Sequence, residues 1–246
     1  MDAIILKRKD IREYDQIVTC LTDHFGKQEY LIRGVKKIVS KNAAHIEPCS
    51  VVDMEFVSAK SGDMLTTVYT TQYFSHVKKD YIKRLVADML LTLVDMCTTT
   101  GEDLTVYPLL LETLDILNTK RPLLDPVYFI DRFVLYLGKA VGISPVLEAC
   151  CICKSNKKDD TEYILSIKQG GICCRSCVPL EGAIYPFCAE YRTILTMSTC
   201  NMSLRQQGLF HAYLHHHMSF HSPQSIPDWG NIKKWLNVAD LCIIET

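Results

Sequence analysis

Two cysteine pairs with the same internal spacing constrain the fold of this chain more than any other feature. The pairs are Cys150-x-x-Cys153 and Cys174-x-x-Cys177. A gap of two residues allows the turn between two cysteines to aim both thiolates at one metal ion, and two such turns complete a tetrahedral shell of sulfur ligands. Because four protein ligands leave no open coordination position, the pattern predicts one structural zinc ion rather than a catalytic one.

The residues around the pairs refine this prediction. Cys151 and Cys173 adjoin the pairs in the wrong register, so we expect them to point away or to pack beneath the loop. Gly170-Gly171, directly before the second pair, supplies the backbone freedom that a tight turn needs. Two redox dithiols, or cysteines buried by coincidence, are the alternative interpretation. The remaining cysteines are scattered singly, as small buried apolar residues are: Cys20, Cys49, Cys97, Cys188, Cys200 and Cys242.

Composition places the chain among soluble globular proteins. Its 246 residues suffice for one large domain or two modest ones, and 48% of them are hydrophobic against 22% charged. No apolar run approaches the ~20 residues that span a bilayer, and the N-terminal apolar run is too short for a signal peptide. We therefore expect a cytosolic protein, in which a reducing environment keeps the 12 cysteines out of disulfides.

The first part of the chain has the pattern of short strands. Apolar, β-favouring runs alternate there with turn signals such as Ser61-Gly62-Asp63. Five short strands in about 75 residues suit a small barrel such as the OB-fold, and a split antiparallel sheet is the alternative. The expected strands are Ala3–Leu6, Ile17–Leu21, Glu29–Ile32, Val51–Val57 and Leu65–Tyr73.

From about Lys79 the apolar period changes to that of helices. Asp125-Pro126, for example, is an N-cap followed by proline at the first helical position. The pattern thus predicts an α+β protein, with a small barrel or split sheet over 1–78 and an α-helical domain over 79–246 that contains a zinc module at about 147–180. The expected helices begin near Lys79, after Gly101-Glu102-Asp103 and at Pro126, and then cover Ala189–Thr199, Leu204–Phe220 and Ile232–Leu241.

Sequence motifs for catalysis are missing. The chain has no G-x-x-x-x-G-K-[ST] phosphate loop, no G-x-G-x-x-G and no H-E-x-x-H, and no paired carboxylates lie close together on a plausible catalytic element. We expect no enzyme active site.

Five histidines are concentrated in one predicted helix: His211, His215, His216, His217 and His221. Two of their pairs have the i, i+4 spacing of helical metal ligands, but no carboxylate lies among them in the sequence. A partly exposed helical face is the favoured interpretation, and a second metal site is the alternative.

A net charge of −1 excludes a protein that coats nucleic acid by charge alone, so any such role needs a local basic patch. Arg33, Lys36, Lys37 and Lys41 fall between the third and fourth expected strands, and no acidic residue intervenes between Tyr30 and Ile46. Such a loop is a natural contact for a phosphate backbone, and a solvated loop is the alternative. Arg12 and Lys27 lie near other strand ends and could join the contact.

The order of several motifs resembles the RecO family of bacterial DNA-repair proteins along nearly the whole chain. The matching segments run in order along the sequence: Arg12–Val18, Gly26-Lys27, Arg33–Lys37, Glu47-Pro48, Gly142–Pro145 with Leu147, and the two cysteine pairs with Gly170-Gly171. The chain departs from the family pattern at Pro223, which Gln224 follows where a basic residue is frequent, and in its nearly neutral charge.

The resemblance implies an N-terminal OB-fold followed by a helical domain with an inserted zinc module. It implies binding of single- and double-stranded DNA, annealing of complementary strands, and loading of RecA together with RecR onto strands covered by single-strand-binding protein, without ATP. Arg33, Lys36 and Lys37 become the best candidate DNA contacts. The helical domain would receive the tail of the single-strand-binding protein, with the helix that carries Arg132 as one candidate surface. The resemblance also implies a bacterial, nucleoid-associated protein.

Two other functions compete with this interpretation. One is a zinc-containing scaffold subunit whose barrel and helices bind only protein. The other is a nuclease or transferase whose active site has no recognisable motif.

Overall fold

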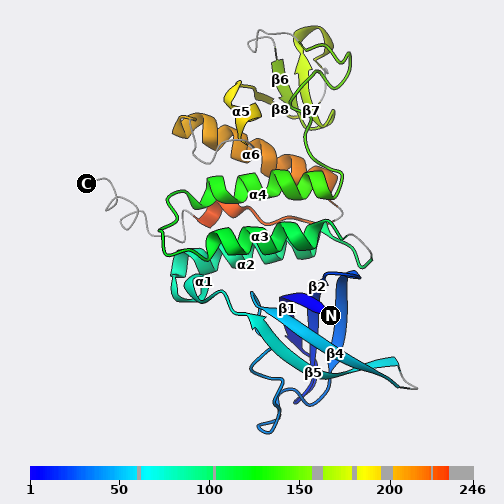
Figure 1. The fold of residues 1–246 in the computed structure, drawn as a ribbon. Coiled ribbons are helices and arrows are strands. Elements are labelled where there is room, and N and C mark those ends of the chain that lie inside the picture. The colour runs from blue at the N-terminus through cyan, green and yellow to red at the C-terminus, as the bar shows by residue number, and fades with distance from the viewer. Residues whose placement is uncertain are drawn as a thin grey trace. The chain divides into compact units, whose positions relative to one another are not determined.

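The computed structural model describes residues 1–59, 62–101, 104–156, 163–178, 182–194, 202–222 and 224–232. The chain divides into two compact units, Met1–Leu124 and Asp125–Thr246. Figure 1 shows the elements of both units in chain order. Each unit has its own sheet and its own helices, and each is described by itself.

The first unit begins with a five-stranded antiparallel sheet. Its strands are β1 (Asp2–Asp10), β2 (Gln16–Thr22), β3 (Gly26–Ile32), β4 (Val51–Ala59) and β5 (Gly62–Gln72). Their order in the sheet is β3-β2-β1-β4-β5, and the two outer strands approach each other, so the sheet curls into a small barrel. This order is that of an OB-fold, a five-stranded, partly open barrel. The prediction of five strands and an OB-fold is confirmed.

Apolar side chains at alternate positions of the strands fill the interior of the barrel. Every second residue of a strand points to the same face, and these positions carry β-branched or small apolar side chains. Ala3 and Ile5 of β1 and Val18 and Cys20 of β2 are fully buried in this core. The register between β1 and β2 shifts between Ile5 and Lys7, and such an irregularity bends a strand as barrel closure requires.

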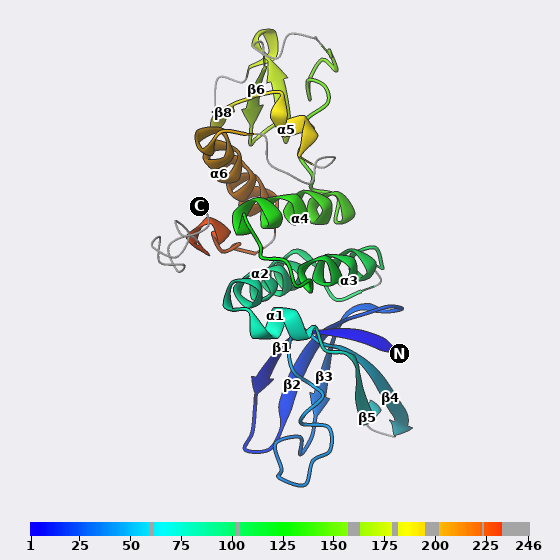
Figure 2. The same cartoon turned by 60° about the vertical axis from the view of Figure 1, so that its left-hand side comes forward.

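Three helices complete the first unit at one end of the barrel (Figure 2): α1 (Ser75–Lys79), α2 (Tyr81–Cys97) and α3 (Val106–Leu117). The side chain of Asp80 caps α2 by accepting a hydrogen bond from the Lys83 backbone N–H at 3.1 Å. The barrel is tied to α2 by Lys7 and Lys27, which both form ion pairs with Asp95.

The second unit is built around α4 (Pro126–Ala140) and α6 (Leu204–His221). Asp125 caps α4 by accepting from the Tyr128 N–H at 3.0 Å, with Pro126 in the first turn, as the sequence predicts. A capping box of Ser203 and Gln206 begins α6. The shorter elements are β6 (Tyr163–Ser166), β7 (Gly171–Cys174), the 3-10 turn η2 (Arg175–Cys177), β8 (Ile184–Pro186), α5 (Glu190–Thr193) and the 3-10 turn η3 (Trp229–Asn231).

The second unit differs from the sequence prediction in its small sheet. Strands β6, β7 and β8 form an antiparallel sheet in the order β7-β6-β8, and the sequence pattern indicates no strand in this part of the chain. Of the helix expected over 189–199, the described part is helical over Glu190–Thr193. Residues 195–199, the helix expected from 233 onward, Pro223, Cys200 and Cys242 lie outside the described residues. The predicted domain boundary at residue 78 stays a prediction.

No helix in the described part of the chain is long and apolar enough to cross a membrane.

Candidate metal centre and nucleic-acid interface

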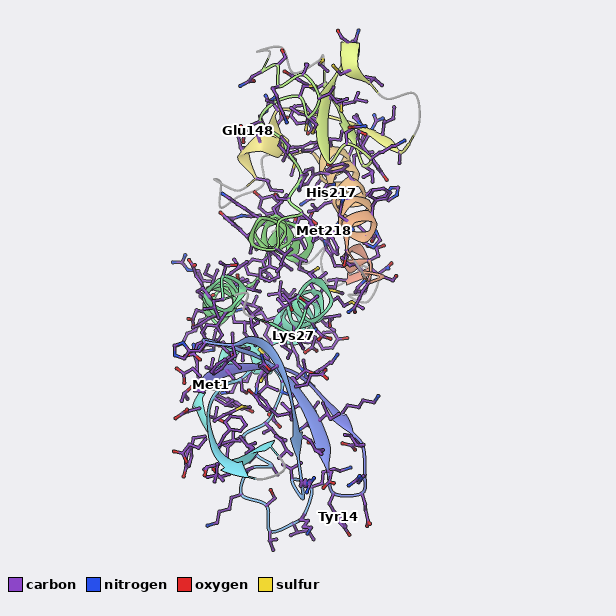
Figure 3. The ribbon with its side chains drawn as sticks, turned by 90° about the vertical axis from the view of Figure 1, so that its right-hand side faces the viewer. Met1, Tyr14, Lys27, Glu148, His217 and Met218 are labelled. Atoms are coloured by element: carbon purple, nitrogen blue, oxygen red, sulfur yellow. The ribbon has the colours of Figure 1, made fainter. Side chains whose placement is uncertain are left out.

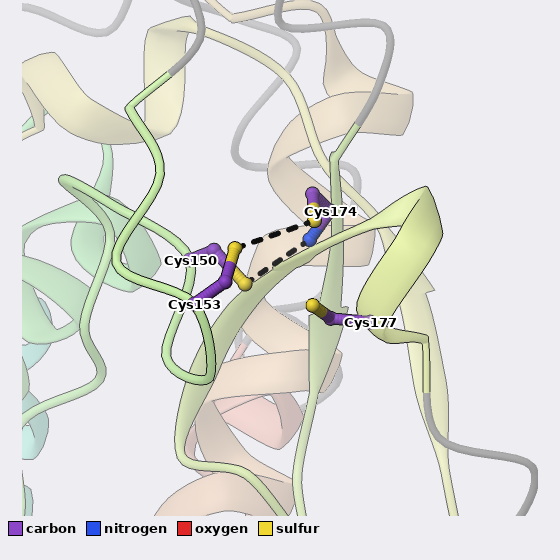
Figure 4. Close-up of side chains that lie close together, drawn as sticks. All are labelled: Cys150, Cys153, Cys174 and Cys177. Carbon is purple, nitrogen blue, oxygen red and sulfur yellow. Dashed lines mark hydrogen bonds between the residues drawn. The ribbon is translucent and has the colours of Figure 1, made fainter.

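The four cysteines with the two-residue gap meet at one point (Figure 4): Cys150, Cys153, Cys174 and Cys177. Their sulfur atoms all lie within 4.8 Å of one another, and the Sγ atoms of Cys153 and Cys174 are 3.8 Å apart. Four sulfurs around one point are the ligand set of a tetrahedral metal site. The register chosen from the sequence is therefore the one that the structure brings together, and the cluster is capable of binding a metal ion.

Local backbone geometry shapes the first pair. The Cys150 N–H donates to the Ser155 carbonyl at 3.0 Å, and the Lys154 N–H donates to the Cys150 carbonyl at 2.9 Å. Lys154 has a φ of 59°, in the left-handed region, which turns the chain back after Cys153. The second pair is shaped differently, because Cys174 ends β7 and the η2 turn carries Cys177.

Gly171 allows the two halves of the module to approach each other. The Val146 N–H donates to the Gly170 carbonyl and the Ile172 N–H donates to the Val146 carbonyl, both at 2.9 Å. A Cβ atom on Gly171 would lie 2.2 Å from the Val146 oxygen and 2.9 Å from the Cys151 sulfur. The sequence predicts that the glycine pair supplies turn flexibility, whereas at Gly171 the requirement is close backbone approach.

The electrostatics of the cluster favour a cation. Burial opposes ionisation of the Cys150 thiol, but N–H groups of Cys174, Cys153 and Ile152 outweigh burial and lower the pKa of Cys150 to about 6. Hydrogen bonds with Cys174 and Cys153 raise the pKa of Cys177 to about 12, so a proton is retained where thiolates crowd together. A divalent ion would replace that proton and remove the repulsion between thiolates.

Cys151 and Cys173 stay outside the cluster, as expected. Strand alternation turns Cys173 away from its neighbour Cys174, and burial raises the pKa of Cys173 to about 11. Burial also raises the pKa of Cys151. Of the scattered cysteines, Cys20, Cys49 and Cys97 are buried and Cys188 is half-buried, which is the pattern of small apolar residues.

His211 lies between two carboxylates that are remote from it in sequence. Its Nδ1 is 3.0 Å from Asp131 Oδ1, and its Nε2 is 3.1 Å from Asp228 Oδ1. Burial opposes protonation of His211, but its hydrogen bonds to Asp131 and Asp228 outweigh burial and raise its pKa. Trp229 Nε1 donates to the same Asp131 oxygen at 2.7 Å. Neither carboxylate is a near neighbour of the histidines in the sequence, because Asp131 lies in α4 and Asp228 is the residue that caps η3.

The other four histidines are held by separate hydrogen bonds. Their partners are the Ile226 carbonyl for His215, the Tyr185 hydroxyl for His216, the Ile143 carbonyl for His217 and the Ile167 carbonyl for His221. His217 is buried and the other four histidines of α6 are half-buried, so the helical face is partly exposed. Within the described residues the cysteine cluster alone gathers three or more ligating groups closely enough for a metal.

The basic loop, residues 33–45, projects from the barrel between β3 and β4. Arg33, Lys36, Lys37 and Lys41 are all exposed on it. The turn between β1 and β2 lies beside this loop, because the Lys36 N–H donates to the Tyr14 carbonyl at 3.1 Å. Arg12 is exposed on that turn and lies 3.7 Å from Asp15.

Tyr14 is a candidate contact that the sequence analysis did not identify. Its ring is exposed, and Lys37 Nζ lies 5.9 Å from the ring centroid. An exposed aromatic ring beside cations is a stacking surface for bases. The signal that could have revealed Tyr14 is its position next to Arg12 in the turn before β2.

Lys27, which the sequence offers as a further DNA contact, does not lie on this surface. Figure 3 shows Lys27 at the end of the barrel where the helices pack and Tyr14 at the opposite end. Lys27 is buried, its Nζ forms an ion pair with Asp95 at 2.7 Å, and the same amine donates to the Thr98 carbonyl at 3.2 Å. A charge that is buried and paired is not available to a phosphate.

Together the two units define a class of protein: one unit is an OB barrel with an exposed cationic loop, and the other is a helical unit with a four-cysteine cluster capable of binding a metal ion. Comparison with known proteins gives the particular family. Residues 1–75 match the family described as Recombination protein O N terminal, and residues 78–198 match Recombination protein O C terminal. The chain belongs to the RecO family.

Individual relatives agree. The DNA repair protein RecO of Syntrophomonas wolfei is 32% identical over 178 residues, which cover 71% of this chain and 68% of that protein. The RecO of Syntrophus aciditrophicus is 31% identical over 74% of this chain and 70% of its own length. The RecO of Streptomyces griseus is 28% identical over 88% of this chain and 93% of its own length. The family is a non-enzymatic recombination mediator, which confirms the prediction that the chain is not an enzyme.

Proposed function

We propose that this protein binds single- and double-stranded DNA through its basic loop, anneals complementary strands, and acts with RecR to load RecA onto strands covered by single-strand-binding protein. The observation that carries the proposal is the exposure of four cations on one loop of the barrel, Arg33, Lys36, Lys37 and Lys41. Arg12 joins them from the adjacent turn. Phosphate neutralisation by such cations supplies most non-specific affinity.

The ion pairs on this surface do not oppose the proposal. Lys36 lies 2.5 Å from Asp10 and Arg12 lies 3.7 Å from Asp15, but the side chains of Lys36 and Arg12 are substantially exposed. Solvent-exposed ion pairs contribute little to stability, and a phosphate can replace either carboxylate. Tyr14 would add base stacking, which tolerates every sequence.

We propose that the metal is a single zinc ion with a structural role. Four cysteine sulfurs are the common ligand set of structural zinc sites, and the set leaves no open position for substrate. A zinc ion with four cysteine ligands would take no part in a reaction on DNA. It would hold the Cys150 turn against the end of β7 and thereby stabilise the second unit.

The remaining partners are proposed from family membership. RecR and the tail of single-strand-binding protein would bind the protein, the latter on the helical part, where α4 with Arg132 is one candidate surface. The setting would be the bacterial cytoplasm, at the nucleoid.

Salt-dependent binding to a single-stranded oligonucleotide tests the DNA-binding part. We expect log affinity of the wild type to fall linearly with log salt concentration. The triple variant Arg33→Ala/Lys36→Ala/Lys37→Ala should lower the slope by about 2, because each lost phosphate contact removes ~0.7 from it. A triple variant at exposed cations that are not part of the loop, Lys120→Ala/Arg121→Ala/Lys139→Ala, has the same charge change and should keep the wild-type slope.

Strand annealing in the same salt series extends the test to activity. The loop variant should anneal complementary oligonucleotides more slowly than the matched control. A wild type without salt-sensitive binding would favour the competing function, a scaffold subunit that binds only protein.

A further inference from the structure

The two most exposed large apolar side chains among the described residues are neighbours on the basic loop. Ile38 is 104% exposed and Val39 is 84% exposed. Isolated apolar residues are normal on a protein surface. Two adjacent β-branched side chains in full contact with water, on a loop otherwise rich in lysine, indicate a partner with an apolar component.

A tight turn places both side chains at the tip of the loop. The Ser40 N–H donates to the Lys37 carbonyl at 2.8 Å, so Ile38 and Val39 occupy the two central positions of a β-turn. The Lys37 N–H in turn donates to the Gly34 carbonyl at 3.1 Å. Branching at Cβ restricts χ1 of both tip residues, which makes the tip stiff.

The base of the loop is fixed to the barrel on both sides. Val35 and Ile46 are buried in the barrel core. Asn42 Nδ2 donates to the Thr66 carbonyl at 3.2 Å, and the Gly34 N–H donates to Asp15 Oδ1 at 2.8 Å. Residues 36–41 therefore project from an anchored frame, and Ile38 and Val39 are held outward.

The lysines on both sides of the tip indicate what kind of partner binds there. Lys36 and Lys37 precede the apolar pair and Lys41 follows it, and the exposed ring of Tyr14, on the adjoining turn, lies beside Lys37. An apolar groove of a protein does not require flanking cations. DNA presents closely spaced phosphates on both sides of apolar base faces, which complements a stiff apolar tip between lysines.

We infer that Ile38 and Val39 form a wedge that inserts between stacked bases of bound DNA while the lysines hold the flanking phosphates. Neither side chain carries a hydrogen-bonding group, so the wedge does not distinguish one base sequence from another. Inserted apolar side chains unstack a base step. Bases that are held unstacked are free to meet a complementary strand, so the inference rests on the proposed DNA binding and gives the loop a role in annealing.

The test uses the full chain and an oligonucleotide with 2-aminopurine, a base analogue whose fluorescence rises when it is unstacked. Wild type should raise the fluorescence on binding. The double variant Ile38→Ser/Val39→Ser should bind with the same salt slope and an affinity within about tenfold of wild type, yet leave the fluorescence low. Leu204→Ser, at a position 83% exposed at the start of α6, is the matched control and should behave as wild type.

Each outcome decides between two hypotheses. If wild type binds and the double variant raises fluorescence equally, the wedge is wrong while the proposed DNA binding stands. If wild type does not bind DNA in a salt-dependent manner, the proposed function itself fails. Co-sedimentation with vesicles of anionic phospholipid by wild type but not by the double variant, with unchanged 2-aminopurine signals, would reassign the tip to a membrane surface and overturn the wedge. Thermal unfolding should be unchanged in the double variant, because both side chains lie in solvent.

Discussion

Gly171 has no room for a side chain in the metal module. A Cβ atom there would lie 2.2 Å from the Val146 oxygen and 2.7 Å from the Val146 nitrogen, and backbone atoms cannot move aside cheaply. We expect Gly171→Ala to destabilise the second unit by about 1–3 kcal/mol, the usual cost of overpacking, and to reduce metal content. Thermal unfolding and metal analysis of the purified protein measure both effects.

Gly208 provides the matched control for this substitution. It lies inside α6, and a Cβ atom there would meet nothing within 4 Å. Alanine should therefore stabilise the helix by about 0.5–1 kcal/mol. Equal unfolding temperatures for Gly171→Ala and Gly208→Ala would contradict the close-approach argument.

Sequence reasoning at the residue scale succeeded where the determinant is local. Two residues between cysteines fix the reach of a turn, so the four ligands could be chosen from spacing alone. The burial of Lys27 could not be predicted, because its neighbours in sequence say nothing of Asp95, its partner 68 residues further along the chain. Tyr14 and Ile38 were missed for the same reason, since exposure is a property of the folded surface.

At the scale of elements, α6 carries a histidine whose burial makes the stability of its unit depend on pH. Burial lowers the pKa of His217 to about 4, although its hydrogen bond to the Ile143 carbonyl opposes this shift. The ordinary pKa of the unfolded chain is ~6.5, so between about pH 6.5 and 4 the unfolded state binds the proton and the folded state does not. We expect the free energy of unfolding to fall over this range, by at most about 3 kcal/mol.

Low pH could also destabilise the protein by releasing a bound metal ion. Comparison of two variants separates that loss of stability from the loss caused by protonation of His217. Denaturant unfolding of wild type and His217→Gln should show that the variant loses less stability between pH 6.5 and 4, since glutamine can still donate to the Ile143 carbonyl but does not titrate. His216→Gln, on the half-exposed neighbouring position, should retain the wild-type pH dependence. Parallel pH curves for wild type and His217→Gln would refute the assignment.

Long periodic elements were predictable and short ones were not. The strands of the barrel and the helices α2, α4 and α6 repeat an apolar period several times, which gives a readable signal. Strands β6, β7 and β8 are 4, 4 and 3 residues long, too short for any period to show. Their pairing joins residues apart in sequence, since Ile164 of β6 lies opposite Cys173 of β7 on one side and Pro186 of β8 on the other.

At the scale of the whole molecule, the order of motifs indicated an OB-fold followed by helices and a cysteine module, and family membership agrees with that order. The division into units could not be predicted, because periodicity shows where helices begin and not which core they join. Helices α2 and α3 belong to the unit Met1–Leu124 together with the barrel. Only the contacts of their buried faces, such as Asp95 with Lys7 and Lys27, decide this.

The proposed DNA-binding loop lies in the first unit and the proposed zinc site lies in the second. Loss of the metal should therefore destabilise the second unit and leave DNA binding by the first unit intact. The basic loop is anchored by Val35, Ile46 and Asn42, all within the first unit. Cys174→Ser removes one of four ligands, so we expect it to lose zinc and to lower the unfolding temperature, while affinity for a single-stranded oligonucleotide stays within about threefold of wild type. Cys173→Ala, one residue away and outside the cluster, should keep its zinc.

The measurements are zinc per chain, thermal unfolding, and binding at a temperature where the variant is folded. Loss of binding in folded Cys174→Ser, with binding intact in Cys173→Ala, would show that the module itself contacts DNA and would move the proposed interface from the barrel loop to include it.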